Sequence, residues 1–383
     1  MLDRVQAGPA SRMSAGWRDR AAGRLDRLLS SAAFRAGATR FLPTRPIARR
    51  RARQLFDLCA GFVYSQVLLA LVQLRIPELL LERPLTVFEL SMQLRMKPAA
   101  VERLLLAAVS LRLLSRRRGD RFGLGPLGAA LIDNPGLTAM IEHHGLLYDD
   151  LRDPVALLRG ELHDTALGRY WPYADTGNLP GLPDGTTASY TALMAASQPM
   201  IASEVLAAYP LGRHRCLLDV GGGSGAFLAE ALARTPGLRG MVFDLAPVAT
   251  AASARFAACR LVERATAIAG DFTHDPLPNG ADIVSLVRVL HDHDDAAASA
   301  LLRAVRAALA MDGTLLLAEP MAGTPGAAAA GDAYFGFYLL AMGSGRPRRQ
   351  EEIESLVRGA GFSRIRHLPT STPLLARVLV AQP

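Results

Sequence analysis

A run of imidazoles and carboxylates is the most reactive stretch of the sequence. It lies in VRVLHDHDDA (287–296) and contains His291, Asp292, His293, Asp294 and Asp295. An apolar segment typical of a buried strand, Asp282 to Val287, precedes it, and Glu319 follows the next such segment, Thr314 to Ala318. A histidine at a strand end can take a proton from a hydroxyl group whose oxygen attacks an electrophile. We therefore predict that His291 is a general base and that the Glu319 carboxylate orients it.

The same run allows two plainer interpretations. A metal ion could bind it, but the adjacent side chains are crowded and no distant cluster of partner ligands accompanies them, so we expect no metal. Asp294 could instead be the N-cap of a helix predicted from Asp294 to Leu309. A cap at Asp294 and a base at His291 are compatible.

A glycine-rich turn predicts a second functional site. A short apolar strand, Cys216 to Val220, runs directly into Gly221, Gly222, Gly223 and Gly225. A helix is predicted next, from Phe227 to Ala233, and such a turn lets the backbone approach a ligand at a helix N-terminus. The following strand, Met241 to Phe243, ends at Asp244, which is placed to accept hydrogen bonds from both hydroxyls of a ribose. This pattern indicates a site for a nucleoside cofactor.

The order of the glycines distinguishes between nucleosides. GGGSG reads Gly-x-Gly-x-Gly, whereas pyrophosphate sites usually read Gly-x-Gly-x-x-Gly. Asp219 lies two residues before the first glycine, where a carboxylate would repel a pyrophosphate but suit an ammonium or a sulfonium. The pattern therefore favours S-adenosylmethionine over NAD, and a tight turn without a ligand is the plain alternative.

Alternating strands and helices position these residues. A third strand is predicted from Thr266 to Ala269 and a terminal one from Leu374 to Val380. Further helices are predicted over Pro247 to Cys259, Ala333 to Met342 and Glu351 to Arg358. Such alternation predicts an α/β fold with a doubly wound, mostly parallel sheet that binds ligands at the carboxyl ends of its strands. The polar residues at or just after these ends are Asp219, Asp244, Asp271, His291 and Glu319.

The N-terminal 53 residues hold the excess positive charge of the 383-residue chain. They contain thirteen arginines against three aspartates, whereas the remainder carries 30 basic and 32 acidic residues. Around Trp17 to Leu29, apolar residues and arginines could share an amphipathic helix on an anionic membrane. A solvated, disordered arm is the equal alternative. Binding to nucleic acid is not expected, because few aromatic residues accompany the charge.

Residues 54–125 predict a winged-helix domain. Gln54 to Arg75 is apolar on more than one face, as at a dimer interface, and Pro77 is expected to close it. A second helix, Thr86 to Leu94, begins with a capping box, and further elements are a helix from Pro98 to Leu114 and a hairpin from Ser115 to Leu124. We interpret the domain as a dimerisation domain, with DNA binding as the alternative.

The remaining boundaries follow from composition. Residues 126–210 are expected to be a helical linker that lines a substrate pocket, and residues 211–383 the cofactor-binding domain. The cysteines (Cys59, Cys216 and Cys259) have no paired spacing and suit a reducing compartment. No signal peptide is apparent, and Ala60 to Leu74 is too short to span a membrane. We therefore expect a cytoplasmic protein, peripheral on the cytoplasmic face of the inner or photosynthetic membrane if the arm binds lipid.

From about residue 54 to its end, the chain resembles the winged-helix class I O-methyltransferases, which use S-adenosylmethionine to methylate small-molecule hydroxyl groups. The resemblance depends on LLDVGGGSGAF, VFDL, GDF, LVRVLHDHDD and LLLAEP, in that order. It implies that the cofactor contacts are Asp219, Gly221, Gly223, Asp244, Asp271, Phe272 and Arg288. It also implies that His291 is the base, Asp292 its neighbour in the motif and Glu319 the orienting acid.

One position departs from that pattern. Plant members carry a second acid after the segment that matches Ala341 to Gly345, where this chain reads GRPRRQEE. The matching residue is Pro347, so either Glu319 alone orients the imidazole or Glu351 assists it.

Three segments are more similar to the bacterial carotenoid O-methyltransferases of the spheroidene pathway: TRPIARRRARQLFDLCAGFVYSQVLLA, YTALMAASQPM and GDAYFGFYLLAMGSGRPR. This resemblance implies methylation of the C1 tertiary hydroxyl of an acyclic hydroxycarotenoid, hydroxyneurosporene or demethylspheroidene. The expected apolar pocket includes Tyr190, Met194, Phe335, Tyr338 and Met342. A phenolic or polyketide hydroxyl is the alternative substrate, and a regulator that only senses S-adenosylmethionine is the alternative from another class.

Overall fold

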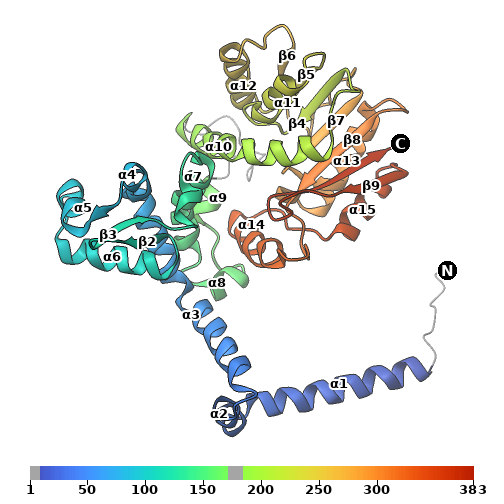
Figure 1. Cartoon of the computed structure of the whole chain (residues 1–383). Helices are drawn as coiled ribbons and strands as arrows, with labels where there is room; N and C mark the ends of the chain where they lie inside the picture. The colour runs from blue at the N-terminus through green and yellow to red at the C-terminus, as the bar shows by residue number, and fades with distance from the viewer. Residues whose placement is uncertain (1–8, 171–183) are drawn as a thin grey trace.

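Seven strands form one sheet in the C-terminal half of the protein (Figure 1). The computed structural model describes residues 9–170 and 184–383. The strands are β4 (Cys216–Val220), β5 (Arg239–Asp244), β6 (Ala265–Ala269), β7 (Ile283–Val287), β8 (Thr314–Glu319), β9 (Arg364–Leu368) and β10 (Arg377–Gln382). Their order is β6-β5-β4-β7-β8-β10-β9, and β10 alone runs antiparallel to its neighbours, β8 and β9. The predicted mostly parallel, doubly wound sheet is thus confirmed.

Two apolar layers cover the two faces of this sheet. Successive residues of β4 point to opposite faces, so that Leu217 packs with Phe227 of α11 (Ala226–Arg234), whereas Leu218 packs with Leu302 of α13 (Asp295–Ala308). Helices α12 (Ala246–Ala258) and α15 (Gln350–Gly359) complete the two layers. The chain order reverses between β4 and β7, which opens a crevice at the carboxyl ends of these strands.

Two details of the sheet differ from the prediction. Strand β9, RIRHL, was not predicted, because it is an edge strand with arginines and no continuous apolar run. The last strand was predicted to begin at Leu374 but begins at Arg377, because Leu375 donates its N–H to Thr372 in a turn.

The N-terminal domain packs three helices against a small sheet. Helices α4 (Ile76–Glu82), α5 (Val87–Leu94) and α6 (Pro98–Ser110) surround β1 (Leu85–Thr86), β2 (Leu114–Arg117) and β3 (Arg121–Leu124). The capping box between Thr86 and Glu89 and the hairpin turn at Gly119 are confirmed. The prediction for Pro77 was wrong: α3 (Arg45–Gln73) ends earlier, and Pro77 lies in the first turn of α4, where its missing N–H is tolerated. Helix α6 also ends earlier than predicted, since Leu114 belongs to β2.

Helices from the middle of the chain connect the two domains. They are α7 (Pro135–Asp150), α8 (Pro154–Leu158), α9 (Ala166–Tyr170) and α10 (Asp184–Ala208), with a short 3-10 turn, η1 (Gly128–Leu131), before them. Helix α10 contacts both α7 and α11, so that it bridges the domains (Figure 1). The helix predicted from Ala333 to Met342 begins earlier in the structure. It consists of a π-helical segment, η3 (Ala329–Phe335), followed by α14 (Gly336–Met342).

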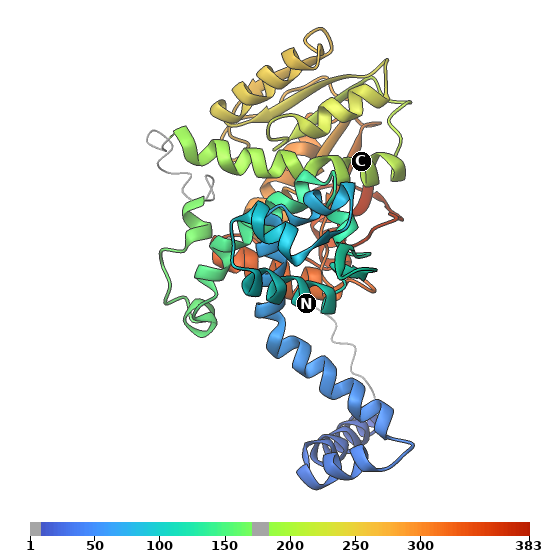
Figure 2. The same cartoon turned by 60° about the vertical axis from the view of Figure 1, so that its left-hand side comes forward.

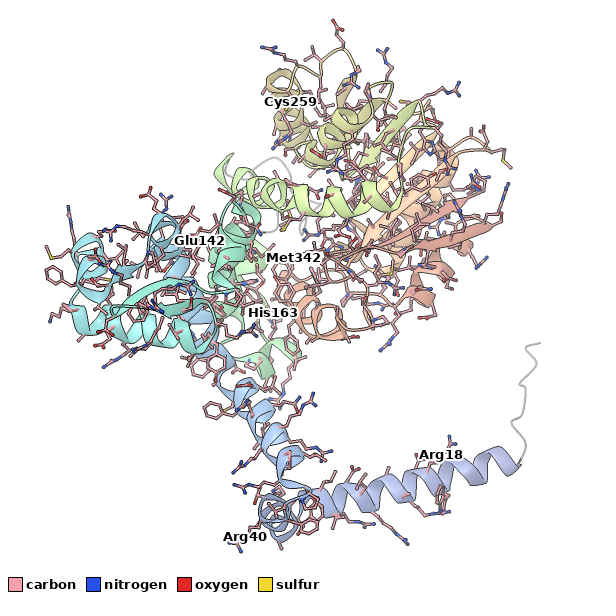
Figure 3. The ribbon with its side chains drawn as sticks, viewed as in Figure 1. Arg18, Arg40, Glu142, His163, Cys259 and Met342 are labelled. Carbon is pink, nitrogen blue, oxygen red and sulfur yellow. The ribbon has the colours of Figure 1, made fainter. Side chains whose placement is uncertain are left out.

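The N-terminal arm, α1 (Pro9–Ser30) and α2 (Ala32–Arg40), projects away from both domains (Figures 1 and 2). Arg18 and Arg40 lie on it, far from the sheet (Figure 3). Helix α3 runs without a break through the predicted boundary at residue 53. By length and composition alone α3 could cross a membrane, although its last turns, at Leu71 and Val72, are buried in the protein. The expectation of no membrane span stays a prediction.

Candidate active site

A buried imidazole and carboxylate face each other at the carboxyl ends of β7 and β8. His291 lies in η2 (Leu290–Asp292), and its Nδ1 is 2.5 Å from Oε2 of Glu319, the last residue of β8. Oε1 of Glu319 accepts hydrogen bonds from the backbone N–H groups of Val289 (3.1 Å) and Leu290 (2.7 Å). Glu319 thereby fixes both the loop and the ring, and Nδ1–H is the donor to the carboxylate. This arrangement leaves Nε2 as the proton acceptor.

A second carboxylate approaches that acceptor. Oδ1 of Asp292 is 3.1 Å from Nε2 of His291. Burial raises the pKa of Asp292 to about 6. Burial alone would lower the pKa of His291, but the Asp292 and Glu319 carboxylates outweigh burial and the nearby Arg288, so that the pKa is raised from its ordinary 6.5. Glu351, the alternative acid proposed from the sequence, is exposed in the first turn of α15.

The carboxylates of Asp292 and Glu319 beside His291 predict how activity depends on pH. His291 must be neutral to accept a proton, so kcat/KM should rise with pH through a pKa above 6.5 and reach its plateau on the alkaline side. Asp292→Asn removes one of the two negative charges and should move this limb to lower pH. Initial rates between pH 5.5 and 9.5 would test both statements, and a limb centred below pH 6 in the unchanged enzyme would contradict them.

The glycine turn lines a cavity that is open to solvent and contains about 740 Å³ of empty space, open solvent included. Its walls include Gly221, Gly222, Gly223, Ser224, Asp244, Phe272, Arg288 and His293. Asp244 lies at the tip of β5, where Oδ2 accepts the N–H of Gly223 (2.8 Å) and Oδ1 that of Leu245 (2.8 Å). Glycine is required at position 225, because a Cβ there (φ +71°) would lie 2.6 Å from the Phe256 ring.

These walls fit an adenosyl cofactor. The Asp244 carboxylate lines the cavity at the tip of the strand after the glycine turn, where a carboxylate can accept hydrogen bonds from ribose hydroxyls. The rings of Phe272 and His293 lie edge to face with centroids 5.1 Å apart and give the cavity an aromatic wall for a base. Among the residues that the structure describes, no three His, Cys, Asp or Glu side chains are grouped to hold a metal ion.

Two of the predicted cofactor contacts, Asp219 and Asp271, are not among the residues that line this cavity. Asp219 is buried beneath the glycine turn, and its Oδ1 accepts a hydrogen bond from Ser285 Oγ (2.6 Å). Its Oδ2 has no hydrogen-bond partner in the structure, and burial raises its pKa to about 7. Asp271 accepts hydrogen bonds from the N–H and hydroxyl of Thr273 and contacts the ring of His274, which ties it to its own loop. Both carboxylates support the loops that surround the cavity.

A second cavity, also open to solvent and with about 1110 Å³ of empty space, open solvent included, adjoins the first. Its apolar walls come from α7, α10, η3, α14 and the loop before β10, and they include Leu137, Met140, Met194, Met200, Ile201, Phe335, Met342, Leu374 and Leu375. Of the predicted pocket residues, Met194, Phe335, Tyr338 and Met342 line it, and the side chain of Tyr190 lies outside the described residues.

Two histidine–tyrosine pairs lie at or directly behind this wall. Nε2 of His144 is 2.8 Å from the hydroxyl of Tyr334, and Nε2 of His143 is 2.8 Å from that of Tyr338. Burial lowers the pKa of both histidines, that of His143 to about 4, and raises that of Tyr334 to about 12. Both pairs are therefore neutral near pH 7, and the cavity suits an apolar molecule.

The two cavities meet at residues 288–294, between β7 and α13, which we name the catalytic loop after the proposed base His291. Met194, Arg288 and Asp292 line both of them, and His291 lines the second. Arg288 has a left-handed backbone (φ 59°), and its Nη1 donates to Ser197 Oγ (3.2 Å). A proton acceptor thus lies where molecules in the two cavities would touch.

Several lining residues were not predicted. His293 belongs to the His-Asp motif, but the sequence analysis did not predict that it lines the cofactor cavity. His144 and Leu375 carry no sequence signal, because only the packing of α7 and of the last loop against α10 brings them to the second cavity.

A doubly wound sheet with a glycine turn, a carboxylate at the tip of its second strand and a buried His–Glu pair defines a nucleoside-dependent transferase. Residues 148–363 match the O-methyltransferase domain, and residues 56–134 match the O-methyltransferase dimerisation domain. The chain therefore belongs to the family of S-adenosylmethionine-dependent O-methyltransferases.

Named relatives agree with this assignment. Over 355 residues, 93% of each chain, the protein is 44% identical to demethylspheroidene O-methyltransferase of Cereibacter sphaeroides. It is 39% identical to the enzyme of that name from Rhodobacter capsulatus, over 88% of this chain and 83% of that one. Human N-acetylserotonin methyltransferase, solved in complex with S-adenosylmethionine, superposes with a TM-score of 0.72 at 25% identity, over 87% of this chain and 97% of that one.

Proposed function

We propose that this protein methylates the C1 tertiary hydroxyl of an acyclic hydroxycarotenoid, such as hydroxyneurosporene or demethylspheroidene. One observation carries the proposal: the large apolar cavity has the His291 base in its wall and shares Arg288 and Asp292 with the cofactor cavity. The names of the two bacterial relatives support this substrate class.

The geometry assigns distinct tasks to the residues. When bound, S-adenosylmethionine supplies an electrophilic methyl group on a sulfonium. A tertiary alcohol is far too weak an acid for an imidazole to ionise beforehand, so His291 takes the proton as the oxygen attacks or afterwards. The apolar walls exclude water and hold the hydroxyl group beside Nε2, and this positioning provides much of the acceleration.

Product analysis tests the proposed substrate. The purified protein is incubated with S-adenosylmethionine labelled in its methyl group and with either hydroxylated acyclic carotenoids or simple phenols. Label in a carotenoid methyl ether, with little in the phenols, supports the proposal. Label only in the phenols would replace it with the alternative of a phenolic or polyketide hydroxyl. Cofactor binding and DNA retention without any turnover would indicate a regulator.

A homodimer is part of this proposal. Several large apolar side chains of α3 are 64–81% exposed in the single chain: Leu55, Phe56, Leu58 and Phe62. They lie in or next to the segment that matches the dimerisation domain. A second copy that packs against this face would bury them, and sedimentation equilibrium should give twice the mass of the chain.

The arm suits peripheral contact with an anionic membrane on the cytoplasmic face. On α1, Trp17, Leu25 and Leu28 share one face, and all three are about half exposed or more. Arg20, Arg24 and Arg27 form the adjoining stripe at helical spacing, and the aspartates of α1 lie on the opposite side. This distribution matches helices that lie in the plane of a membrane surface.

Removing the arginine stripe should weaken lipid binding. Each arginine near an anionic surface contributes about 1 kcal/mol, so the triple change of Arg20, Arg24 and Arg27 to Gln should weaken binding to anionic vesicles by roughly a hundredfold. Cosedimentation with phosphatidylglycerol vesicles measures it, and phosphatidylcholine vesicles are the control. Equal binding of the unchanged protein and the triple variant to the anionic vesicles would exclude this role for the arginine stripe.

A further inference from the structure

Residues 344–348 hold the backbone of the catalytic loop. Four successive carbonyl oxygens, those of residues 290–293, each accept a hydrogen bond from this short segment. Nη1 of Arg348 donates to Leu290 (2.7 Å), and Nη2 of the same guanidinium donates to His293 (2.6 Å). Between them, the backbone N–H of Arg346 donates to His291 (2.9 Å), and the Ser344 hydroxyl donates to Asp292 (2.7 Å).

The two backbones are in direct contact at one glycine. A Cβ on Gly345 would lie 2.1 Å from the carbonyl oxygen of His291 and 2.5 Å from the carbonyl carbon of Asp292, and its φ is +77°. The backbone N–H of Gly345 also donates to Oδ1 of Asp294 (3.2 Å). Residues 344–348 therefore fix the position of the catalytic loop by direct backbone contact.

Arg348 is the central side chain of this contact. It is 2% exposed, and besides the two carbonyls its Nε donates to Oδ1 of Asp295 (2.8 Å). A planar guanidinium can serve three acceptors at fixed angles, which an ammonium cannot do. The buried guanidinium thus has one carboxylate partner, Asp295, and its other donors bond the loop that contains His291.

We infer that Arg348 is a positioning residue for methyl transfer, which holds the loop so that the His291 ring meets Glu319 on one side and the substrate cavity on the other. The inference rests on the proposed role of His291 as the base. It also explains the departure at Pro347: the segment after α14 acts on the loop backbone here, whereas Asp292 supplies the second carboxylate beside the ring.

Three variants test the inference. Arg348→Met removes all the guanidinium bonds, and Arg348→Lys keeps a buried cation but lacks the planar fork whose two Nη atoms bond the two carbonyls. Arg152→Met is the matched control, because Arg152 also bonds an aspartate, Asp149, but is exposed and lines neither cavity. The melting temperature shows whether each variant is folded, and the affinity for S-adenosylhomocysteine shows whether the cofactor cavity is intact. Nitrogen NMR of the His291 ring reports its tautomer and titration without any substrate.

Arg348→Met and Arg348→Lys are expected to lower kcat per folded molecule about 10- to 100-fold, Lys less than Met. Both should also move the titration of His291, which Asp292, Glu319 and Arg288 face, back towards that of a free imidazole. Arg152→Met should stay within about twofold of the unchanged enzyme. An unchanged His291 titration and kcat in folded Arg348→Lys would overturn the inference. If the unchanged enzyme methylated no carotenoid, the proposed substrate would fail, while the NMR titration would still decide the role of Arg348.

Discussion

Replacing His291 with alanine is expected to lower kcat by about 10²- to 10⁴-fold, the usual contribution of a general base. The ring is 6% exposed and held by Glu319, so no neighbouring imidazole can take its place without moving the loop. Cofactor binding should persist, because His291 lines the second cavity and the glycine turn and Asp244 line the first. Steady-state rates and calorimetry with S-adenosylhomocysteine measure the two properties separately.

The matched control is His163→Ala. His163 is exposed in the loop before α9 and lines neither cavity, so its replacement should leave kcat within about twofold. A His291→Ala enzyme with nearly unchanged turnover would remove His291 from the reaction. A loss of turnover together with a loss of cofactor binding would instead indicate a collapsed loop.

The sequence predicted best where short-range physics decides the structure. The strand Cys216–Val220 and its glycine turn were predicted to the residue, because an apolar run followed by glycines allows few other conformations. The capping box of α5 is equally local. By contrast, β9 is stabilised by pairing with β10 at the sheet edge, and its own sequence does not indicate a strand.

Side-chain direction explains why the predicted cofactor contacts behave differently. Asp219 was assigned to the cofactor from its place just before the glycines and Asp244 from its place at the tip of the next strand, and the family resemblance implied both. Asp219 pairs in register with Ser285 on β7 and bonds its hydroxyl inside the sheet, whereas Asp244 ends β5 and turns towards the glycine N–H. A sequence shows which residue ends a strand more readily than which neighbour its side chain meets.

Arg348 illustrates the same limit at the catalytic loop. The motif around His291 is contiguous and therefore visible in the sequence, but the segment that supports it is more than 50 residues away along the chain. Comparison with plant enzymes drew attention to a missing acid at Pro347. The structure shows that the next residue, the buried Arg348, bonds the backbone of the loop, whereas Asp292 lies beside the ring.

Glu319→Gln should be nearly as damaging as the loss of the base itself, although the two side chains have the same shape. The amide oxygen of glutamine can still accept the N–H groups of Val289 and Leu290, so the loop and the melting temperature should change little. Its NH2 group, however, would face Nδ1 of His291 and can only donate. The ring would then present a lone pair at Nδ1 and a hydrogen at Nε2, the tautomer that cannot take a proton from the substrate. By this argument kcat should fall roughly 10²- to 10⁴-fold, as other enzymes lose activity when the residue that orients a catalytic histidine enforces the wrong tautomer. Rates measured beside the nitrogen spectrum of the ring would show both changes together. A variant that kept most of its turnover with the hydrogen at Nε2 would mean that Glu319 only holds the loop and that His291 does not act as the base.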